Sequence, residues 1–201
     1  NKLNQILSKD NDSGSEAESN SYLFGVLEKT NESLERLSAE EKLKWAYEEF
    51  GLKFVVTTSF GIQSAVLLKM CSELKGSIKP QIIWIDTGYL PPETYSYAEN
   101  LTNKLDLDLK VFQSEISPAR MEAIHGRLWE TNSLKDIDKY HLMRKVIPLE
   151  KAFSELNVDC WASGVRRNQT NNRKSMKYLE EIRNRLSLRP LLDWSKKDIF
   201  Y

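Results

Sequence analysis

The sequence predicts an α/β fold, a doubly wound and mostly parallel sheet with helices on both faces. Two observations predict it. Short apolar runs rich in β-branched residues alternate along the chain with helical segments, an order typical of right-handed βαβ units. Polar segments containing glycine directly follow three of these runs, as expected where the strands of such a sheet lead into ligand-binding loops. The 201 residues, of which 40% are hydrophobic and 29% charged, are enough for one globular domain.

The N-terminal quarter of the chain is expected to be a tail followed by helices. Residues 1–20 are rich in Ser, Asn and acidic residues, so we expect a mobile tail there and a single domain over residues 21–201. Residues 22–50 carry apolar side chains at helical spacing. Ser38 and Glu41 have the spacing of a capping box, which predicts that a second helix begins there.

Four strands and the helices between them are predicted next. The strands are the apolar runs 54–58, 81–85, 109–112 and 159–162, and the helices are 64–74, 92–105 and 147–156. Pro92 and Pro148 stand near the starts of two helices, where a missing N–H costs nothing. Near the C-terminus, Leu188–Leu192 is interpreted as a further strand and Ser195 as the N-cap of a last helix.

Composition excludes several classes of protein. Lys and Arg number 29, and so do Asp and Glu, which is not expected of a general nucleic-acid binder. No apolar run reaches the roughly 18 residues of a membrane span, and the N-terminus has no signal-peptide pattern, so we expect a cytoplasmic protein without a membrane contact. Cys71 and Cys160 are too few for a disulfide scaffold or a cysteine-ligated metal site, so we expect two reduced, buried thiols.

Three polar segments follow predicted strands, where an open parallel sheet binds its ligands. The candidate ligand-binding residues are Ser59, Phe60, Gly61, Gln63 and Ser64 after the first strand, Asp86, Thr87 and Gly88 after the second, Gly164, Arg166, Arg167, Gln169 and Arg173 after the fourth, and Lys145 before a helix. The first segment leads into a helix, whose free N–H groups favour an anion. Residues 163–179 contain five Lys or Arg and no acid, which indicates a small anionic ligand. An ordinary turn, a helix-capping aspartate and a solvated basic loop remain the alternatives.

Six segments in unbroken order resemble the assimilatory 3′-phosphoadenylyl sulfate (PAPS) and adenylyl sulfate (APS) reductase family. They are residues 57–66, 85–94, 125–130, 144–149, 164–170 and 189–194. The resemblance implies an adenine nucleotide α-hydrolase-like fold of the PP-loop type. It implies an oxidoreductase that reduces PAPS to sulfite and adenosine 3′,5′-bisphosphate in sulfate assimilation and cysteine biosynthesis. It also implies a homodimer and a thioredoxin or glutaredoxin as the partner that releases sulfite.

Two departures from the family pattern limit what the resemblance implies. The family's nucleophilic cysteine lies in a C-terminal Glu-Cys-Gly-x-His motif that is absent here, so we expect the S-sulfocysteine to form on a cysteine beyond Tyr201 and no catalytic residue within this chain. Members with an iron–sulfur cluster carry a Cys-Cys pair where this sequence has Tyr140 and His141, so we expect no cluster, no other cofactor and PAPS as substrate. Arg144 and Lys145 resemble the cluster-containing branch, which keeps APS as an alternative.

Two further functions stay open at this point. One is an ATP-pyrophosphatase relative, such as the small subunit of sulfate adenylyltransferase. Phe60 and Gln63 speak against it, because they replace residues of that family's more glycine-rich loop. The other is a catalytically inactive nucleotide-binding protein, suggested by the absent cysteine motif.

Overall fold

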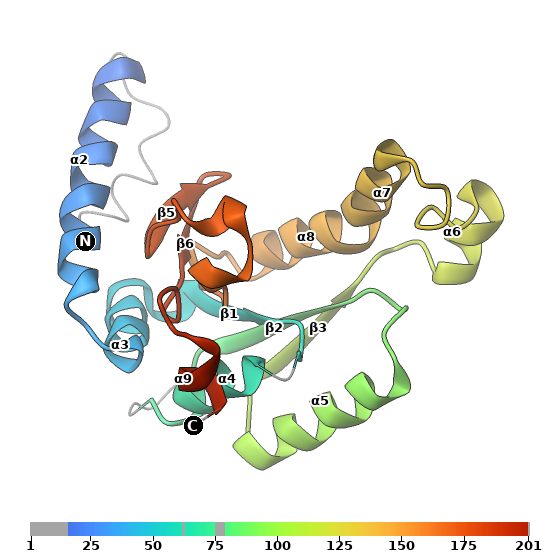
Figure 1. Ribbon diagram of the computed structural model, residues 1–201, viewed down its shortest axis with the longest axis horizontal. Coiled ribbons are helices and arrows are strands. Elements are labelled where there is room, and N and C mark those ends of the chain that lie inside the picture. The colour runs from blue at the N-terminus through green and yellow to red at the C-terminus, as the bar shows by residue number, and fades with distance from the viewer. Residues whose placement is uncertain (1–15, 62, 75–78, 201) are drawn as a thin grey trace.

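Six strands form one sheet in the order β3-β2-β1-β4-β6-β5 (Figure 1). The computed structural model describes residues 16–61, 63–74 and 79–200. The strands are β1 (Phe54–Thr58), β2 (Gln81–Asp86), β3 (Leu109–Gln113), β4 (Cys160–Ala162), β5 (Leu179–Ile182) and β6 (Arg185–Leu188). Every neighbouring pair is parallel except β5 with β6. The predicted mostly parallel sheet is confirmed.

The direction of winding reverses at β1. The chain passes outward from β1 through β2 to β3 and then returns to β4, on the other side of β1. The register sets Val56 beside Ala162, so the segments that follow β1 and β4 leave the sheet at the same edge. A switch point of this kind leaves a crevice beyond the strand ends in an open parallel sheet. The topology therefore places the polar segments after β1 and β4 next to each other at this edge of the sheet.

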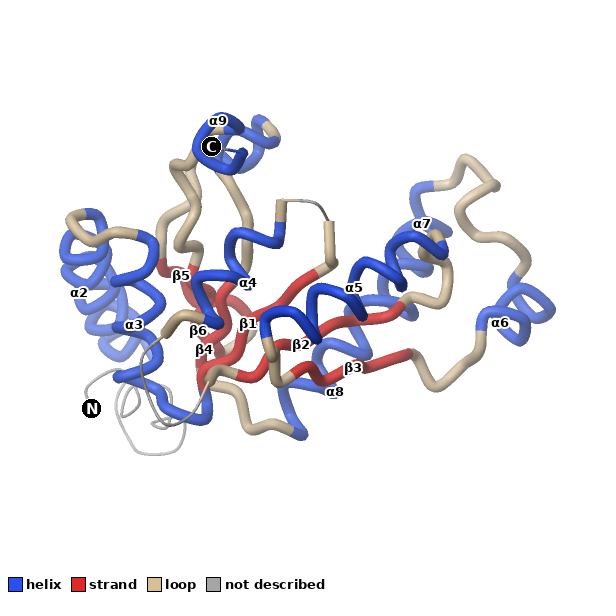
Figure 2. Tube along the Cα trace, turned by 90° about the horizontal axis from the view of Figure 1, so that it is seen from below, coloured by secondary structure: helices blue, strands red, loops and turns tan. Residues whose placement is uncertain are grey.

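Helices cover both faces of the sheet (Figure 2). They are α2 (Glu16–Glu35), α3 (Ala39–Phe50), α4 (Ser64–Ser72), α5 (Pro92–Leu105), α6 (Pro118–His125), α7 (Leu134–His141), α8 (Ile147–Glu155) and α9 (Lys196–Phe200). Short helical turns are η1 (Gly51–Lys53), η2 (Leu142–Val146), η3 (Arg167–Gln169) and η4 (Asn171–Arg173), of which η2 is a π-helix. Helix α3 packs on β1 and β4, whereas α8 packs on β2 and β3 from the other side.

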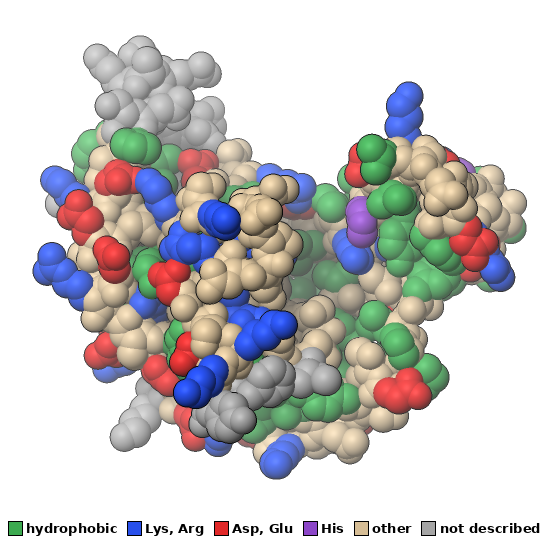
Figure 3. All heavy atoms as spheres, in the orientation of Figure 1, with side chains coloured by type: hydrophobic (Ala, Val, Ile, Leu, Met, Phe, Trp, Pro, Cys, Tyr) green, Lys and Arg blue, Asp and Glu red, His purple; other side chains and the backbone are tan. Residues whose placement is uncertain are grey.

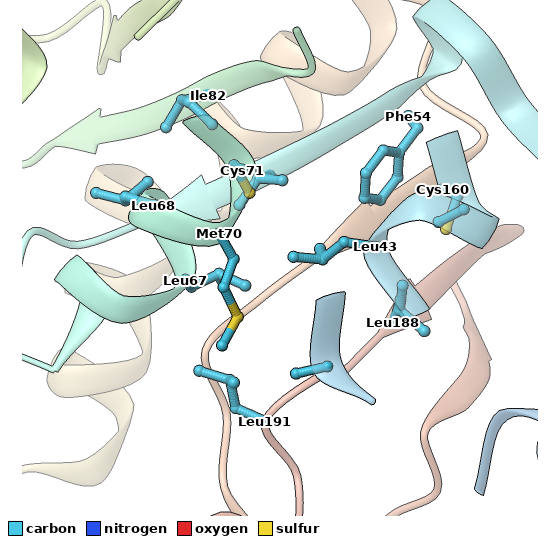
Figure 4. Close-up of a cluster of buried hydrophobic side chains, with 14 of the residues drawn as sticks. Leu43, Phe54, Leu67, Leu68, Met70, Cys71, Ile82, Cys160, Leu188 and Leu191 are labelled. Atoms are coloured by element: carbon cyan, nitrogen blue, oxygen red, sulfur yellow. The ribbon is translucent and has the colours of Figure 1, made fainter. Parts of the chain in front are cut away.

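Side chains of β1 alternate between two apolar clusters, as expected for a strand buried on both faces. Phe54 and Val56 join the larger cluster, which includes side chains of α3 and α4 (Figure 4). Val55 faces the other way and packs with Phe153 of α8. Cys71 and Cys160 are free and buried, as expected. The sheet is thus held rigidly from both sides, which fixes where its strand ends point.

Helix boundaries agree with several sequence signals and differ from others. The capping box of Ser38 and Glu41 begins α3 as predicted, and Ser195 caps α9. Helix α2 spans Glu16–Glu35 in the described structure and so includes five residues that were expected to belong to the tail. The expected tail over residues 1–15 lies outside the described residues.

The predicted strand at Leu188–Leu192 is wrong. Strand β6 ends at Leu188, and the residues after it form turns, in which Pro190 has no N–H to donate to a sheet. The hairpin of β5 and β6 lies just upstream and was not predicted. Its turn residues Arg183 and Asn184 both have positive φ, 53° and 59°, a conformation for which Arg gives no sequence signal.

Residues 114–141 form an arm that carries α6 and α7 away from the sheet (Figures 1 and 2). These two short helices were not predicted. Over the described ranges, no helix is both long and apolar enough to cross a bilayer.

Candidate functional site

The loop after β1 is pinned at both ends and leaves its middle exposed. The Phe60 N–H donates to Thr58 Oγ1 at 3.0 Å, and the buried Phe60 ring meets Trp84 edge to face with ring centroids 4.9 Å apart. The hydroxyl of Ser64 donates to the carbonyl of Gly61 at 2.6 Å. Ser59 and Gly61 are exposed. Phe60 therefore anchors the loop between two exposed residues, just before the N-terminus of α4.

Arg166, in the segment after β4, reaches the loop after β1. Its side chain is buried, with 3% of the residue exposed, and its Nη2 donates to Gln63 Oε1. The Nε of Arg166 is buried and has no hydrogen-bond partner in the described structure. Gln169 Oε1 accepts from the Arg166 N–H at 3.1 Å and from Arg173. The structure therefore brings four of the candidate residues together, and one buried cationic donor among them is unsatisfied.

Arg167, the next residue, points to a different set of partners. Its Nε donates to Asp193 Oδ1 at 2.6 Å, and its Nη1 donates to the carbonyl of Lys174 at 3.0 Å. The hydrogen bond from Arg167 holds the pKa of Asp193 below its usual range. Burial, together with a hydrogen bond to Asp193, raises the pKa of Tyr178 to about 12. Arg167 is thus tied to the chain's own groups and holds the basic segment in place.

The turn after β2 is also occupied by internal contacts. Asp86 Oδ1 accepts from the Gly88 N–H at 2.8 Å and from the Tyr95 hydroxyl at 2.7 Å, and Oδ2 accepts from Gln113 Nε2 at 2.7 Å. The carbonyl of Thr87 accepts from Arg144. Asp86 and Thr87 are buried, whereas Gly88 is exposed. The turn after β2 is therefore held in one conformation by hydrogen bonds within the chain.

The remaining candidates are less closely connected. Lys145 is exposed on η2, and among the described residues no hydrogen bond or ion pair joins it to the others. Gly164 lies beside Leu67 of α4, where an added Cβ would come within 3.9 Å of Leu67 Cδ2.

Supporting residues were harder to find from the sequence. Gln113 is the register partner of Asp86, so its contact depends on how β2 and β3 pair. Asp193 lies 26 residues from Arg167, and only the fold brings the two together. Only the contact between Tyr95 and Asp86 has a local sequence signal. Tyr95 lies nine residues after Asp86, on α5, the helix that follows the Asp86–Gly88 turn.

Neither cysteine is suited to nucleophilic attack. Burial raises the pKa of Cys71 to about 12, and burial also raises the pKa of Cys160. Buried thiols of this kind stay protonated and inert. In residues 16–61, 63–74 and 79–200, no three His, Cys, Asp or Glu side chains gather as a metal site.

Tyr140, in one of the two positions where cluster-containing relatives carry cysteine, packs its ring on the aromatic side chain of Trp129, with centroids 5.5 Å apart.

The surface is hollowed between the arm and the part of the molecule that carries β5, β6 and the segment after β4 (Figure 3). Several Lys and Arg side chains lie on the side of this hollow opposite the arm. Cationic side chains around a concave surface attract small anions more strongly than the same charges spread over a flat one. The shape and charge of this face agree with the anionic ligand expected from the sequence.

A family model and individual relatives point to the same family. Residues 53–201 match the family described as phosphoadenosine phosphosulfate reductase domain. A phosphoadenosine 5′-phosphosulfate reductase of a Synechococcus species is 50% identical over 178 residues, which are 89% of this chain and 76% of that protein. A protein of the same name from Cronobacter sakazakii is 41% identical over 176 residues, covering 88% of this chain and 71% of the relative.

Solved structures agree with the sequence match. The PAPS reductase of Candida auris, crystallised as a phosphate complex, superimposes with a TM-score of 0.73 at 28% identity, covering 86% of this chain and 81% of that one. The FMN adenylyltransferase of Candida glabrata shares the fold alone, with a TM-score of 0.52 at 13% identity over 98% of this chain and 60% of the other. These likenesses confirm the expected nucleotide-binding α/β fold, and the chain belongs to the phosphoadenosine phosphosulfate reductase family.

Proposed function

We propose that this chain holds PAPS across the ends of β1, β2 and β4 and serves as the substrate-binding domain of an enzyme that reduces PAPS to sulfite in sulfate assimilation. The observation that carries the proposal is the buried guanidinium of Arg166, whose Nε has no partner while its Nη2 holds Gln63. An unsatisfied buried donor is costly, and a phosphate or sulfate oxygen of the ligand would satisfy it. Relatives that carry the reductase name at 41–50% identity support the same activity.

The candidate residues divide into two roles in this proposal. Groups on the crevice contact the anionic parts of PAPS: Ser59, Gly61, Gln63, Ser64, Lys145, Gly164, Arg166, Gln169 and Arg173. The other candidates keep the crevice in shape: Phe60, Asp86, Thr87, Gly88 and Arg167. The N-terminus of α4 adds to the first group, because its free N–H groups and dipole favour negative charge.

The reaction transfers a sulfonate group to a thiolate. The thiolate attacks the sulfate sulfur of PAPS, an S–S bond forms, and the S–O bond to the 5′-phosphate breaks. The electron pair leaves with adenosine 3′,5′-bisphosphate, whose developing charge Arg166 and the α4 N-terminus would stabilise. A thioredoxin or glutaredoxin dithiol then attacks the S-sulfocysteine and becomes a disulfide as sulfite leaves with its electron pair and the cysteine is regenerated.

The attacking cysteine is proposed to lie beyond Tyr201, as the family resemblance implies, since burial keeps Cys71 and Cys160 protonated. The enzyme is proposed to be a cytoplasmic homodimer without an iron–sulfur cluster or other cofactor. Tyr140, in one of the two positions of the cluster-binding pair, packs its ring against neighbouring aromatic side chains.

Calorimetric titration of this chain with adenosine 3′,5′-bisphosphate and with AMP tests the proposed ligand. We expect the bisphosphate to bind more tightly, because the 3′-phosphate adds charge-assisted contacts. Equal affinities would favour APS as substrate, and no binding of either would overturn the proposal. Arg36→Ala is the control for arginine variants at the site in the same titration. It removes an exposed guanidinium far in sequence from the crevice loops, and it should leave both affinities unchanged.

The reaction itself is tested on the full-length protein. PAPS with reduced thioredoxin should yield sulfite, whereas ATP with sulfate should yield no APS. The opposite result would assign the protein to the adenylyltransferase class.

A further inference from the structure

One peptide group, between Thr87 and Gly88, is held at both of its polar ends by buried charges. The N–H of this peptide, on Gly88, donates to Asp86 Oδ1 at 2.8 Å. Its carbonyl, on Thr87, accepts from Arg144 Nε at 2.8 Å and also from Arg144 Nη2. A carboxylate and a guanidinium therefore grip the same peptide plane from opposite sides.

Arg144 is buried, with 2% of the residue exposed, and no carboxylate lies within ion-pair distance of it in the described structure. Its hydrogen bonds go to the backbone carbonyls of Thr87 and of Ile116, which lies at the root of the arm. Its guanidinium carbon lies 5.5 Å from the centroid of the Tyr89 ring. Burying a cation without an acidic partner costs free energy, because its hydration is lost. The hydrogen bonds to the carbonyls of Thr87 and Ile116 offset part of that cost.

The π-helical turn η2 puts this side chain inward. Pro148 has no N–H with which to bond the carbonyl of residue 144, and the Ile147 N–H reaches back five residues to Leu142. In this turn Arg144 is buried while its neighbour Lys145 is exposed. The family resemblance of this Arg-Lys pair therefore covers two side chains with different surroundings.

The two charges allow only one orientation of the peptide. If the peptide flipped, its carbonyl would face the Asp86 carboxylate and its N–H would face the Arg144 guanidinium, so both contacts would become repulsive. Gly88 also has φ 75°, and an added Cβ there would meet Arg144 Nη2 at 3.0 Å. The tight packing leaves little room for another conformation of the turn.

We propose that Arg144 is a positioning residue for the nucleotide site, which it serves by locking the Thr87–Gly88 peptide against Asp86 without contacting the nucleotide. The consequence for binding rests on the proposed function, because the turn ends β2 beside the crevice assigned to PAPS. The lock itself is a property of the free protein and is measurable without any ligand.

Amide hydrogen exchange of Gly88, followed by NMR in the ligand-free chain, tests the lock. We expect protection of this amide in the wild-type chain and in the exposed control variant Arg36→Met, and faster exchange in Arg144→Met. Arg144→Lys keeps the charge but not the planar fork, so its exchange rate should lie between the two. A Gly88 amide that exchanges equally in wild type and in both Arg144 variants would overturn the proposal.

Titration with adenosine 3′,5′-bisphosphate, at a temperature where circular dichroism shows each variant folded, tests the effect on the site. Arg144→Met should bind roughly tenfold more weakly than wild type, which is about 1.4 kcal/mol. Wild-type affinity in a folded Arg144→Met would show that the residue only stabilises the fold, and would overturn the positioning role. If that variant does not fold, Arg144→Lys decides, and wild-type exchange together with wild-type affinity there rejects the proposal.

Asp86→Asn adds an independent arm, because the carboxylate and Arg144 are proposed to act on one peptide. The effects of Asp86→Asn and Arg144→Lys on Gly88 exchange should be non-additive in the double variant, and additive effects would contradict a shared peptide. A wild-type chain with a protected Gly88 amide but no bisphosphate binding would reject the proposed function and leave the lock intact.

Discussion

The turn after β2 and the segment after β4 leave the same edge of the sheet, yet they differ in how completely their buried charges are hydrogen-bonded. Asp86 in the turn, and Arg144 of η2 that contacts it, both have hydrogen-bond partners within the chain. In the segment, Arg166 keeps a buried Nε without a partner. Asp86, Arg144 and Arg166 are all buried and ionisable. The difference in hydrogen bonding separates the first two, which hold the backbone of the turn, from Arg166, which has a donor free for a ligand.

The same contrast occurs within a single pair of neighbours. Arg166 points toward Gln63 and the α4 N-terminus, whereas Arg167 points toward Asp193. A guanidinium next to the ligand loop is thus no sign of a ligand contact by itself, and the state of its hydrogen bonds is the better indicator.

The largest effect is expected from filling the turn. Gly88→Ala places a Cβ at 2.7 Å from Pro118 Cγ and forces a side chain onto φ 75°. Backbone strain costs about 1–3 kcal/mol and overpacking adds about 1–3 kcal/mol more. Gly126→Ala is the matched control, because it has a similar φ of 72° with nothing within 4 Å of the added Cβ. Urea unfolding should show the greater loss for Gly88→Ala, and equal losses would show that the turn can yield.

The next effect separates the two adjacent arginines. Arg166→Ala should weaken bisphosphate binding by about 1.5–3 kcal/mol. It should lower the unfolding free energy less than Arg167→Ala does, because the lost hydrogen bond to Gln63 is partly offset by removal of the unmet Nε donor. Arg167→Ala should lower the unfolding free energy, and it should weaken binding only through the loosened segment. Calorimetric affinities and urea midpoints of the two variants provide the measurement. Unchanged affinity in both would remove this segment from the site.

The smallest effect concerns acid. The pKa of Asp193 is held below its usual range by Arg167, so the stability that the carboxylate adds is complete above about pH 4 and is lost as pH falls through the lowered pKa. Asp193 is half exposed, which limits its share to less than about 1 kcal/mol. Asp193→Asn should therefore lower the urea midpoint at pH 7 more than at pH 3. A constant difference at both pH values would mean that the ion pair contributes nothing.

The strands of the parallel sheet were predictable because each is a short apolar run that ends in polar residues. The loops of the site were predictable for the same reason, since strand ends must meet at one edge. The hairpin of β5 and β6 was not, because Arg183 and Asn184 adopt positive φ without a glycine to signal it. The roles of Arg144, Arg166 and Arg167 were also out of reach, because which partner each guanidinium meets depends on packing between segments far apart in the sequence.

The two deeply buried thiols have a practical consequence. Cys71 and Cys160 are the only cysteines in the sequence, and burial raises the pKa of both. An alkylating reagent applied to the folded chain at neutral pH should therefore leave both unmodified. A single cysteine engineered at the rim, for instance Ser59→Cys, could then carry a fluorophore at one known place, with no background from native sulfur.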